Sequence, residues 1–265
     1  MSRLSAVFDA SNRTALIGYV TVGYPSVEAT LEVVPRLVAG GCDVIELGIP
    51  FSDPLADGAT IQNASHHALE HGVTPGVCLE VAAQLSRRVD VPLVFMTYYN
   101  PVLRLGMGRF CDACRESGVS ALIVPDLPPD EGEELGAAAR ARDVDLICLV
   151  TPTATTRRIE LAAERASGFL YLVSLTGVTG AREGMSEGLE DFVERVREST
   201  KLPLCVGFGI STPEQAARVG RIADGVIIGS RLIALMEADP SLSEVSRFIA
   251  NVRFALDSQD PLTRC

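Results

Sequence analysis

The chain has 265 residues and a formal net charge of −11, which argues against nucleic acid or an anionic membrane surface as its main partner. No apolar run approaches the roughly 18 residues of a membrane span, and the N-terminus lacks the apolar core and cleavage site of a signal peptide. The seven cysteines are scattered and odd in number, which is typical of reduced thiols in a cytoplasmic protein. An acidic chain can still bind a small phosphate ester through backbone amides.

Short apolar runs alternate along the whole chain with longer segments of helical periodicity. Such runs, bounded by turn residues, predict buried strands. Eight are predicted, at residues 15–21, 42–48, 92–99, 120–126, 145–152, 169–175, 203–210 and 225–230. A strand followed by a helix, repeated eight times in this length, predicts an α/β fold, the closed (β/α)8 TIM barrel. The alternative is an open doubly wound sheet, but short strands at even spacing favour the barrel.

The helical segments carry recognisable start signals. Thr74, Asp130 and Ser211 are predicted N-caps, and Pro75 and Pro213 stand where a first-turn proline is tolerated. We expect an extra N-terminal helix, within "RLSAVFDAS", to close the bottom of the barrel. No change in composition marks a second domain, so residues 1–265 are predicted to form a single domain.

Glu46 interrupts the apolar run of the second predicted strand. Side chains alternate along a strand, so Ile45 and Leu47 fall on one face and Glu46 on the other. If the aliphatic face packs against helices, Glu46 points into the barrel near its carboxyl end, where active sites of such barrels lie. Burial raises a carboxyl pKa, which suits a group that both donates and accepts a proton. The alternative is a structural glutamate paired with a tyrosine or an arginine.

Two more carboxylates, Asp53 and Asp57, follow in a loop with turn residues such as Pro54 and Gly58. An isolated aspartate at position 57 would fit an Asx-turn. This loop, however, continues directly from the Glu46 strand, so both carboxylates can reach one pocket. Asp53 fits a turn or an interface better.

Glycine-rich loops follow three consecutive predicted strands. In TIM barrels, phosphate commonly binds at the loops after strands seven and eight, beside a helix N-terminus. Gly207 and Gly209 end the seventh strand, and Gly229 and Ser230 stand where a helix begins after the eighth. The loop at residues 176–184 adds glycines and hydroxyls after the sixth. Together these loops predict a phosphate pocket.

Two motifs are typical of metal or redox chemistry but have simpler explanations. His67, Glu70 and His71 spell an inverted zincin pattern, yet a zinc site needs a third ligand, and histidine is favourable in the last turn of a helix. Cys111 and Cys114 form C-x-x-C without a second pair, within an amphipathic helix pattern. No metal site is predicted.

Five blocks resemble the tryptophan synthase alpha chain family, in consistent order over residues 17–230: "VIELGIPFSDPLADGATIQ", "MTYYNPV", "VPDLP", "YLVSLTGVTGAR" and "GFGIS". The first block is highly specific to that family among phosphate-binding barrels. The resemblance implies a (β/α)8 barrel. It also implies a lyase of tryptophan biosynthesis that reversibly cleaves indole-3-glycerol phosphate, by a retro-aldol reaction, to indole and glyceraldehyde 3-phosphate.

The resemblance further implies roles for single residues. Glu46 matches the general acid/base, Asp57 the second catalytic carboxylate, and Tyr171 a residue lining the site near Glu46. Thr179 matches the flexible loop that closes the site. The positions that match phosphate contacts are Gly180, Gly209, Gly229 and Ser230. Apolar residues expected to hold the indole ring are Tyr19, Ile61 and Ile123.

The family works as an α2β2 complex, in which a beta chain that contains pyridoxal phosphate (PLP) receives indole through a tunnel. Pro50, Asp53 and Asn100 fall on the expected contact surface. No lysine motif or cofactor fingerprint indicates PLP in this chain. Two departures are Ala59, where the family usually has proline, and Leu175, where some members carry arginine.

Two other functions remain open from the residues. A different phosphate-binding barrel, such as an isomerase or synthase of the same pathway, would share the glycine signals but not the Glu46 loop block. A regulatory subunit that only activates a partner would not need both carboxylates and the phosphate glycines.

Overall fold

The computed structural model describes residues 2–9, 13–174, 188–207 and 209–258. In this part of the chain, eight parallel strands pair in sequence order and β1 pairs with β8, which closes the barrel. The predicted TIM barrel is therefore confirmed, and the open sheet is excluded. The strands are β1 Ala15–Thr21, β2 Val44–Gly48, β3 Leu93–Met96, β4 Val119–Ile123, β5 Asp145–Val150, β6 Leu170–Val173, β7 Leu204–Gly207 and β8 Gly225–Ile228.

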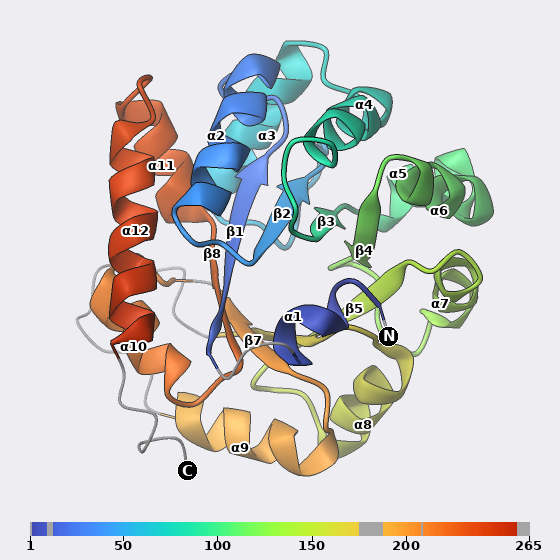
Figure 1. The fold of residues 1–265 in the computed structure, drawn as a ribbon. Coiled ribbons are helices and arrows are strands. Elements are labelled where there is room, and N and C mark those ends of the chain that lie inside the picture. Colours follow the sequence, from blue (N-terminus) through green and yellow to red (C-terminus); the bar gives the residue numbers. More distant parts are fainter. Residues whose placement is uncertain (1, 10–12, 175–187, 208, 259–265) are drawn as a thin grey trace.

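Helices surround these strands on the outside (Figure 1). They are α2 Val27–Ala39, α3 Ala59–Glu70, α4 Pro75–Leu85, α5 Tyr99–Leu105, α6 Met107–Glu116, α7 Glu133–Arg140, α8 Thr156–Arg165, α9 Leu189–Ser199, α10 Pro213–Gly220, α11 Ser230–Ala238 and α12 Ser243–Asp257. None of the helices in the described residues is long and apolar enough to cross a membrane. The prediction of a single domain over residues 1–265 stays a prediction.

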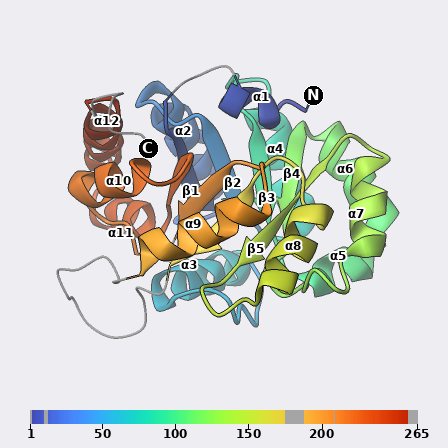
Figure 2. The ribbon, with the colours of Figure 1, turned by 90° about the horizontal axis from the view of Figure 1, so that it is seen from below.

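The N-terminal helix, α1 Ser5–Asp9, lies at one end of the barrel (Figure 2). Leu4, just before it, is fully buried, and a Cβ added to Gly168 would lie 2.6 Å from the Leu4 side chain. The ring of Phe8 meets that of Phe169 edge-on, with the ring centroids 5.9 Å apart. Residues 168 and 169 precede β6, so α1 covers the amino ends of the strands, as predicted.

Thr74 caps α4 as predicted, because its side chain accepts the Val77 N–H. Pro75 and Pro213 occupy the first turns of α4 and α10, also as predicted.

The other two predicted N-caps are wrong. Thr212, not Ser211, caps α10, in a reciprocal capping box with Gln215. Ser211 stands one residue earlier and donates to the same glutamine. Asp130 lies in a turn, 3.7 Å from Arg158, and α7 starts only at Glu133. An N-cap side chain must belong to the residue directly before the first helical turn. Asp130 and Ser211 both stand too early in the chain to fill that position.

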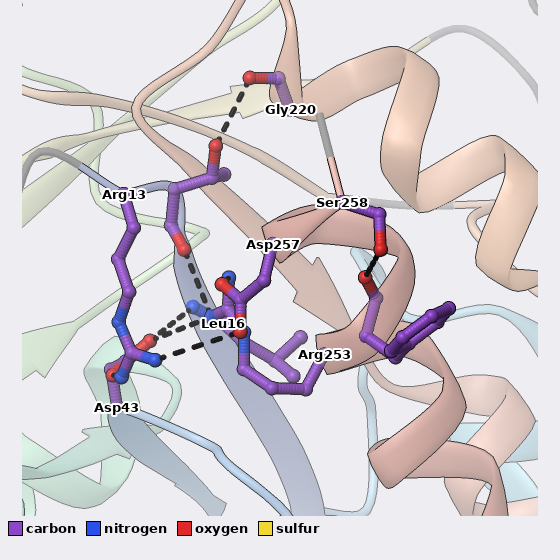
Figure 3. A network of polar contacts seen from close by, with 9 residues as sticks. Arg13, Leu16, Asp43, Gly220, Arg253, Asp257 and Ser258 are labelled. Atoms are coloured by element: carbon purple, nitrogen blue, oxygen red, sulfur yellow. Dashed lines mark hydrogen bonds and ion pairs between the residues drawn. The ribbon is translucent and has the colours of Figure 1, made fainter. Parts of the chain in front are cut away.

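Helix α12 is tied to the amino end of the barrel by a polar network around the buried Arg253 (Figure 3). Arg253 donates from Nη1 to the carbonyl oxygen of Thr14 at 3.0 Å and to Oδ2 of Asp43 at 3.3 Å. Asp43 also accepts the backbone N–H of Leu16 at 2.9 Å and pairs with Arg13 at 2.5 Å. Segments more than 200 residues apart in sequence thus meet at one carboxylate.

Candidate active site

Glu46 faces the barrel interior near the carboxyl end of β2. On β1, Gly18 faces outward, because an added Cβ would meet the side chains of Leu37 and Leu232. Its neighbour Tyr19 therefore faces inward. Glu46 pairs in register with Tyr19 across the parallel strands, so the two side chains share the inner face. Only 1% of Glu46 is exposed. The sequence-based prediction of its direction is confirmed.

A cavity of about 370 Å³ opens beside Glu46 at this end of the barrel. Its lining comes from the inner faces of β1 to β3, β6 and β8, the loop after β2 with α3, the loop after β7, and Gly229 with α11. The described lining residues are Tyr19, Glu46, Asp57, Gly58, Ile61, Met96, Tyr171, Gly209, Ile210, Ser211, Ile227, Gly229, Ser230, Arg231 and Ala234. Most of the predicted site residues thus meet in one hollow.

Two glycines make room for the tyrosines beside Glu46. A Cβ on Gly48 would lie 2.1 Å from the hydroxyl oxygen of Tyr19, and one on Gly207 would lie 2.3 Å from that of Tyr171. No Cβ fits at such distances, so each phenol lies directly over a glycine of the neighbouring strand. Burial raises the pKa of both phenols well above the ordinary value. They therefore stay neutral and border the cavity with aromatic surface.

The electrostatics of Glu46 favour the protonated acid. Burial, and secondly the charge of Asp57, raise the pKa of Glu46 to about 8. Oε2 of Glu46 is buried without a hydrogen-bond partner among the described residues. No arginine or tyrosine among the described residues is hydrogen-bonded to that oxygen. The carboxyl group is therefore held neutral at neutral pH and remains available to a ligand.

Asp57 lies in the loop after β2, and its carboxylate is held by Tyr98, a residue that the sequence did not predict for the site. Tyr98 donates its hydroxyl proton to Oδ2 of Asp57 at 3.1 Å, while Oδ1 is buried without a partner in the described structure. Burial raises the pKa of Asp57 to about 6, and the hydrogen bond from Tyr98 partly opposes that rise. At neutral pH the two carboxyl groups thus differ, with Asp57 ionised and Glu46 protonated.

The opposite wall of the cavity carries the predicted phosphate residues. Gly209 has a φ of +79°, a left-handed conformation that glycine adopts without strain. Gly229 follows β8 and is the N-cap of α11, which begins at Ser230. The N–H groups at the very start of this helix have no carbonyl one turn earlier to bond. Arg231 also lines the cavity, but its guanidinium lies over the Phe248 ring, 5.8 Å from the centroid. Backbone amides at a helix N-terminus therefore remain the main anion-binding groups.

The comparisons with known proteins agree on one family. A family model described as tryptophan synthase alpha chain matches residues 6–258. The tryptophan synthase alpha chain of Dehalococcoides mccartyi is 53% identical, over 97% of this chain and 100% of that protein. That of Chloroflexus aurantiacus is 49% identical, over 97% and 98% of the two chains. A solved structure of Mycobacterium tuberculosis tryptophan synthase has a TM-score of 0.90 at 40% identity, covering 96% of this chain and 98% of its own.

The chain belongs to the tryptophan synthase alpha chain family. It is therefore a lyase that cleaves indole-3-glycerol phosphate in tryptophan biosynthesis. Alpha chains of this family pair with a beta chain.

Some alpha-chain positions named from the sequence lie elsewhere or outside the described residues. Thr179, Gly180 and the departure Leu175 fall within residues 175–187, which are not described. Ile123 is fully buried at the end of β4 and is not among the described residues that line the cavity. Ile61, on α3, does line it.

The positions expected to contact the beta chain lie in the loop after β2 and in α5. Asp53 and Asn100 are exposed, whereas Pro50 is buried. Two leucines present apolar surface in the same two segments: Leu55, in the loop, is 91% exposed, and Leu103, on α5, is 47% exposed.

The histidine motif and the C-x-x-C motif of this alpha chain have structural explanations. His67 and His71 stack on each other, with the ring centroids 4.2 Å apart, and Tyr24 meets His67 edge-on. No group of three potential metal ligands occurs among the described residues. Cys111 and Cys114 are fully buried on α6, and burial raises the pKa of both thiols.

Proposed function

We propose that Glu46 and Asp57 are the two catalytic carboxyl groups of this lyase. The observation that carries the proposal is their difference in protonation within one cavity, with a pKa of about 8 for Glu46 and about 6 for Asp57. Pairs of titratable groups whose environments separate their pKa values are typical of acid/base catalysis.

The reaction needs one protonated and one ionised carboxyl group. The bond between indole C3 and the glycerol carbon breaks only after C3 is protonated, which places positive charge on the ring nitrogen. Ionised Asp57 accepts the ring N–H and stabilises this charge as it develops. Protonated Glu46 delivers its proton to C3, and its carboxylate then takes the proton of the adjacent side-chain hydroxyl. As the carbon–carbon bond breaks, its electron pair returns to the indole ring, and the hydroxyl carbon becomes the aldehyde.

The rest of the cavity fits the two ends of the substrate. We assign the phosphate to backbone amides of Gly209, Gly229 and Ser230, with Gly180 completing the pocket and Thr179 closing it. The indole ring is assigned to the aromatic and aliphatic wall formed by Tyr19, Ile61 and Tyr171.

The assembly proposed is an α2β2 tetramer in which Pro50, Asp53 and Asn100 lie at the contact with the beta chain. PLP is assigned to that beta chain, because PLP enzymes bind the cofactor through a lysine Schiff base. The sequence holds a single lysine, Lys201, which precedes β7 at the end of the barrel opposite the cavity. We assign the complex to the cytoplasm, since the six described cysteines are free thiols.

Glu46→Gln and Asp57→Asn test the proposal, because each keeps the shape of the side chain and removes its acid/base function. Glyceraldehyde 3-phosphate formation from indole-3-glycerol phosphate, measured with the beta chain present, is expected to fall by about 10²-fold or more in each variant. Circular dichroism shows that the variants fold. Turnover like that of the wild type in either variant refutes the assignment, and a pure scaffold would show no turnover in the wild type either.

A further inference from the structure

Tyr98 stands between β3 and α5, as the N-cap residue of α5, and contacts three residues of the loop after β2. Its side chain is 3% exposed, and its ring stacks on Phe51, with the centroids 5.1 Å apart and the planes 22° from parallel. Its hydroxyl oxygen lies 3.0 Å from the backbone nitrogen of Ala56 and 3.1 Å from Oδ2 of Asp57. One phenol thus contacts both the loop backbone and the carboxylate that the loop carries.

The direction of each hydrogen bond follows from chemistry. A backbone N–H can only donate, so the Tyr98 oxygen accepts from Ala56. The phenol proton is then left for Asp57, whose Oδ2 must accept it. An ionised carboxylate accepts such a bond more strongly than a neutral one. Oδ1 of Asp57 remains without a partner in the described structure.

We infer that Tyr98 is a positioning residue that fixes the Asp57 carboxylate through Oδ2 and leaves Oδ1 directed to the substrate. The inference rests on the proposed role of Asp57. Phe51 holds the plane of the phenol, and the Ala56 N–H sets the direction of its proton. The arrangement orders the carboxylate before substrate arrives, and such ordering is what stabilises charge in a transition state.

Tyr98→Phe tests the inference, because it keeps the ring and its stacking on Phe51 and removes only the hydroxyl. Activity is measured as glyceraldehyde 3-phosphate formation in the complex with the beta chain. We expect kcat/KM to fall about 10-fold to 100-fold, the effect of losing one hydrogen bond to a charged group. Ionisation of Asp57 sets the acid limb of the pH profile of kcat/KM. Because the hydrogen bond from Tyr98 lowers the pKa of Asp57, its loss is expected to shift this limb to higher pH by roughly one unit.

Tyr99→Phe is the matched control. Tyr99 is the next residue, and its hydroxyl donates to the sulfur of Met107 at 3.7 Å, so its loss is expected to leave the acid limb in place. A Tyr98→Phe variant that keeps the wild-type acid limb, whether active or weakened, overturns the inference. If Asp57→Asn is fully active, the proposed function itself fails. An inactive Asp57→Asn with an unmoved limb in Tyr98→Phe refutes the positioning role alone.

Discussion

Glu46 shows at the scale of one residue how a catalytic group reduces stability. Its carboxyl group is buried and has an oxygen without a partner among the described residues. Burial of an ionised carboxylate is costly, so the folded chain holds the proton that the unfolded chain releases. The raised pKa that suits catalysis therefore makes folding pH-dependent.

Glu46→Gln is expected to stabilise the protein selectively at high pH. The folded pKa of about 8 lies above the ordinary glutamate pKa of 4.5. Between these two values the unfolded state binds fewer protons than the folded state, so wild-type stability falls as pH rises. Glutamine cannot ionise, so the variant escapes this loss. Urea unfolding should show near-equal stability of both proteins at about pH 4 and an advantage of several kcal/mol for the variant at about pH 8.5.

An equal advantage at both pH values would mean that glutamine packs better and that ionisation is not the cause. Asp53→Asn, at an exposed carboxylate in the neighbouring loop, provides the control and is expected to leave the pH dependence of stability unchanged.

At this scale the sequence predicts Glu46 well and Tyr98 not at all. A charged residue in the middle of an apolar strand is visible in the pattern, and alternation alone sets its direction. Tyr98 lies in a run that reads as strand to residue 99, but β3 ends at Met96. Its partner Asp57 is 41 residues away, and no local pattern reports such a contact.

The catalytic loop that holds Asp57 runs directly into the first turn of α3. Asp57 is two residues before Ala59, the first residue of α3, and Gly58 is the N-cap with φ −74° and ψ 163°. The family usually has proline at position 59. The first helical position tolerates proline, because its N–H has no partner within the helix. The residue before a proline must be extended, and Gly58 already is.

Ala59→Pro is therefore expected to stabilise the chain by about 0.4–1 kcal/mol, since it restricts the unfolded state without removing a helical hydrogen bond. Thermal unfolding followed by circular dichroism measures the change. Ala64→Pro, in the interior of the same helix, is the control and should cost about 3 kcal/mol or more. Destabilisation by Ala59→Pro would show that the loop before α3 cannot accept the restricted backbone.

The elements themselves follow largely from the sequence, because buried parallel strands read as continuous apolar runs. Strand β1 matches the predicted residues 15–21 at both ends. The other strands are shorter than predicted, mostly at their carboxyl ends. There the chain leaves the sheet to build loops, and Ile210, in the loop after β7, lines the cavity rather than extends the ladder.

Across the whole molecule, the network around Arg253 connects the last helix to the first two strands. Arg253 is 7% exposed, and a Cβ on Gly41 would lie 2.6 Å from its aliphatic stem. The network lies at the amino end of the barrel, away from the cavity. Stability and catalysis are thus assigned to opposite ends, as in other barrels of this type.

Arg253→Ala is expected to cost about 3 kcal/mol, because it removes the buried donor of the Thr14 carbonyl and one of the donors of Asp43. Arg247→Ala, on the same helix, is the control: its ion pair with Glu244 is exposed, and its loss should cost roughly 0–1 kcal/mol. Equilibrium unfolding in urea compares the two. Equal losses would show that α12 depends on its apolar face and not on the network.

The glycines under the two phenols constrain how this barrel can diverge over evolutionary time. Because Gly48 supports Tyr19 and Gly207 supports Tyr171 with no space for a methyl group, a larger side chain at either glycine displaces the ring above it. Such a change survives only when the tyrosine shrinks in the same lineage. We therefore expect coupled substitutions at two pairs of positions, 19 with 48 and 171 with 207. A change in the shape of this part of the pocket requires two substitutions together.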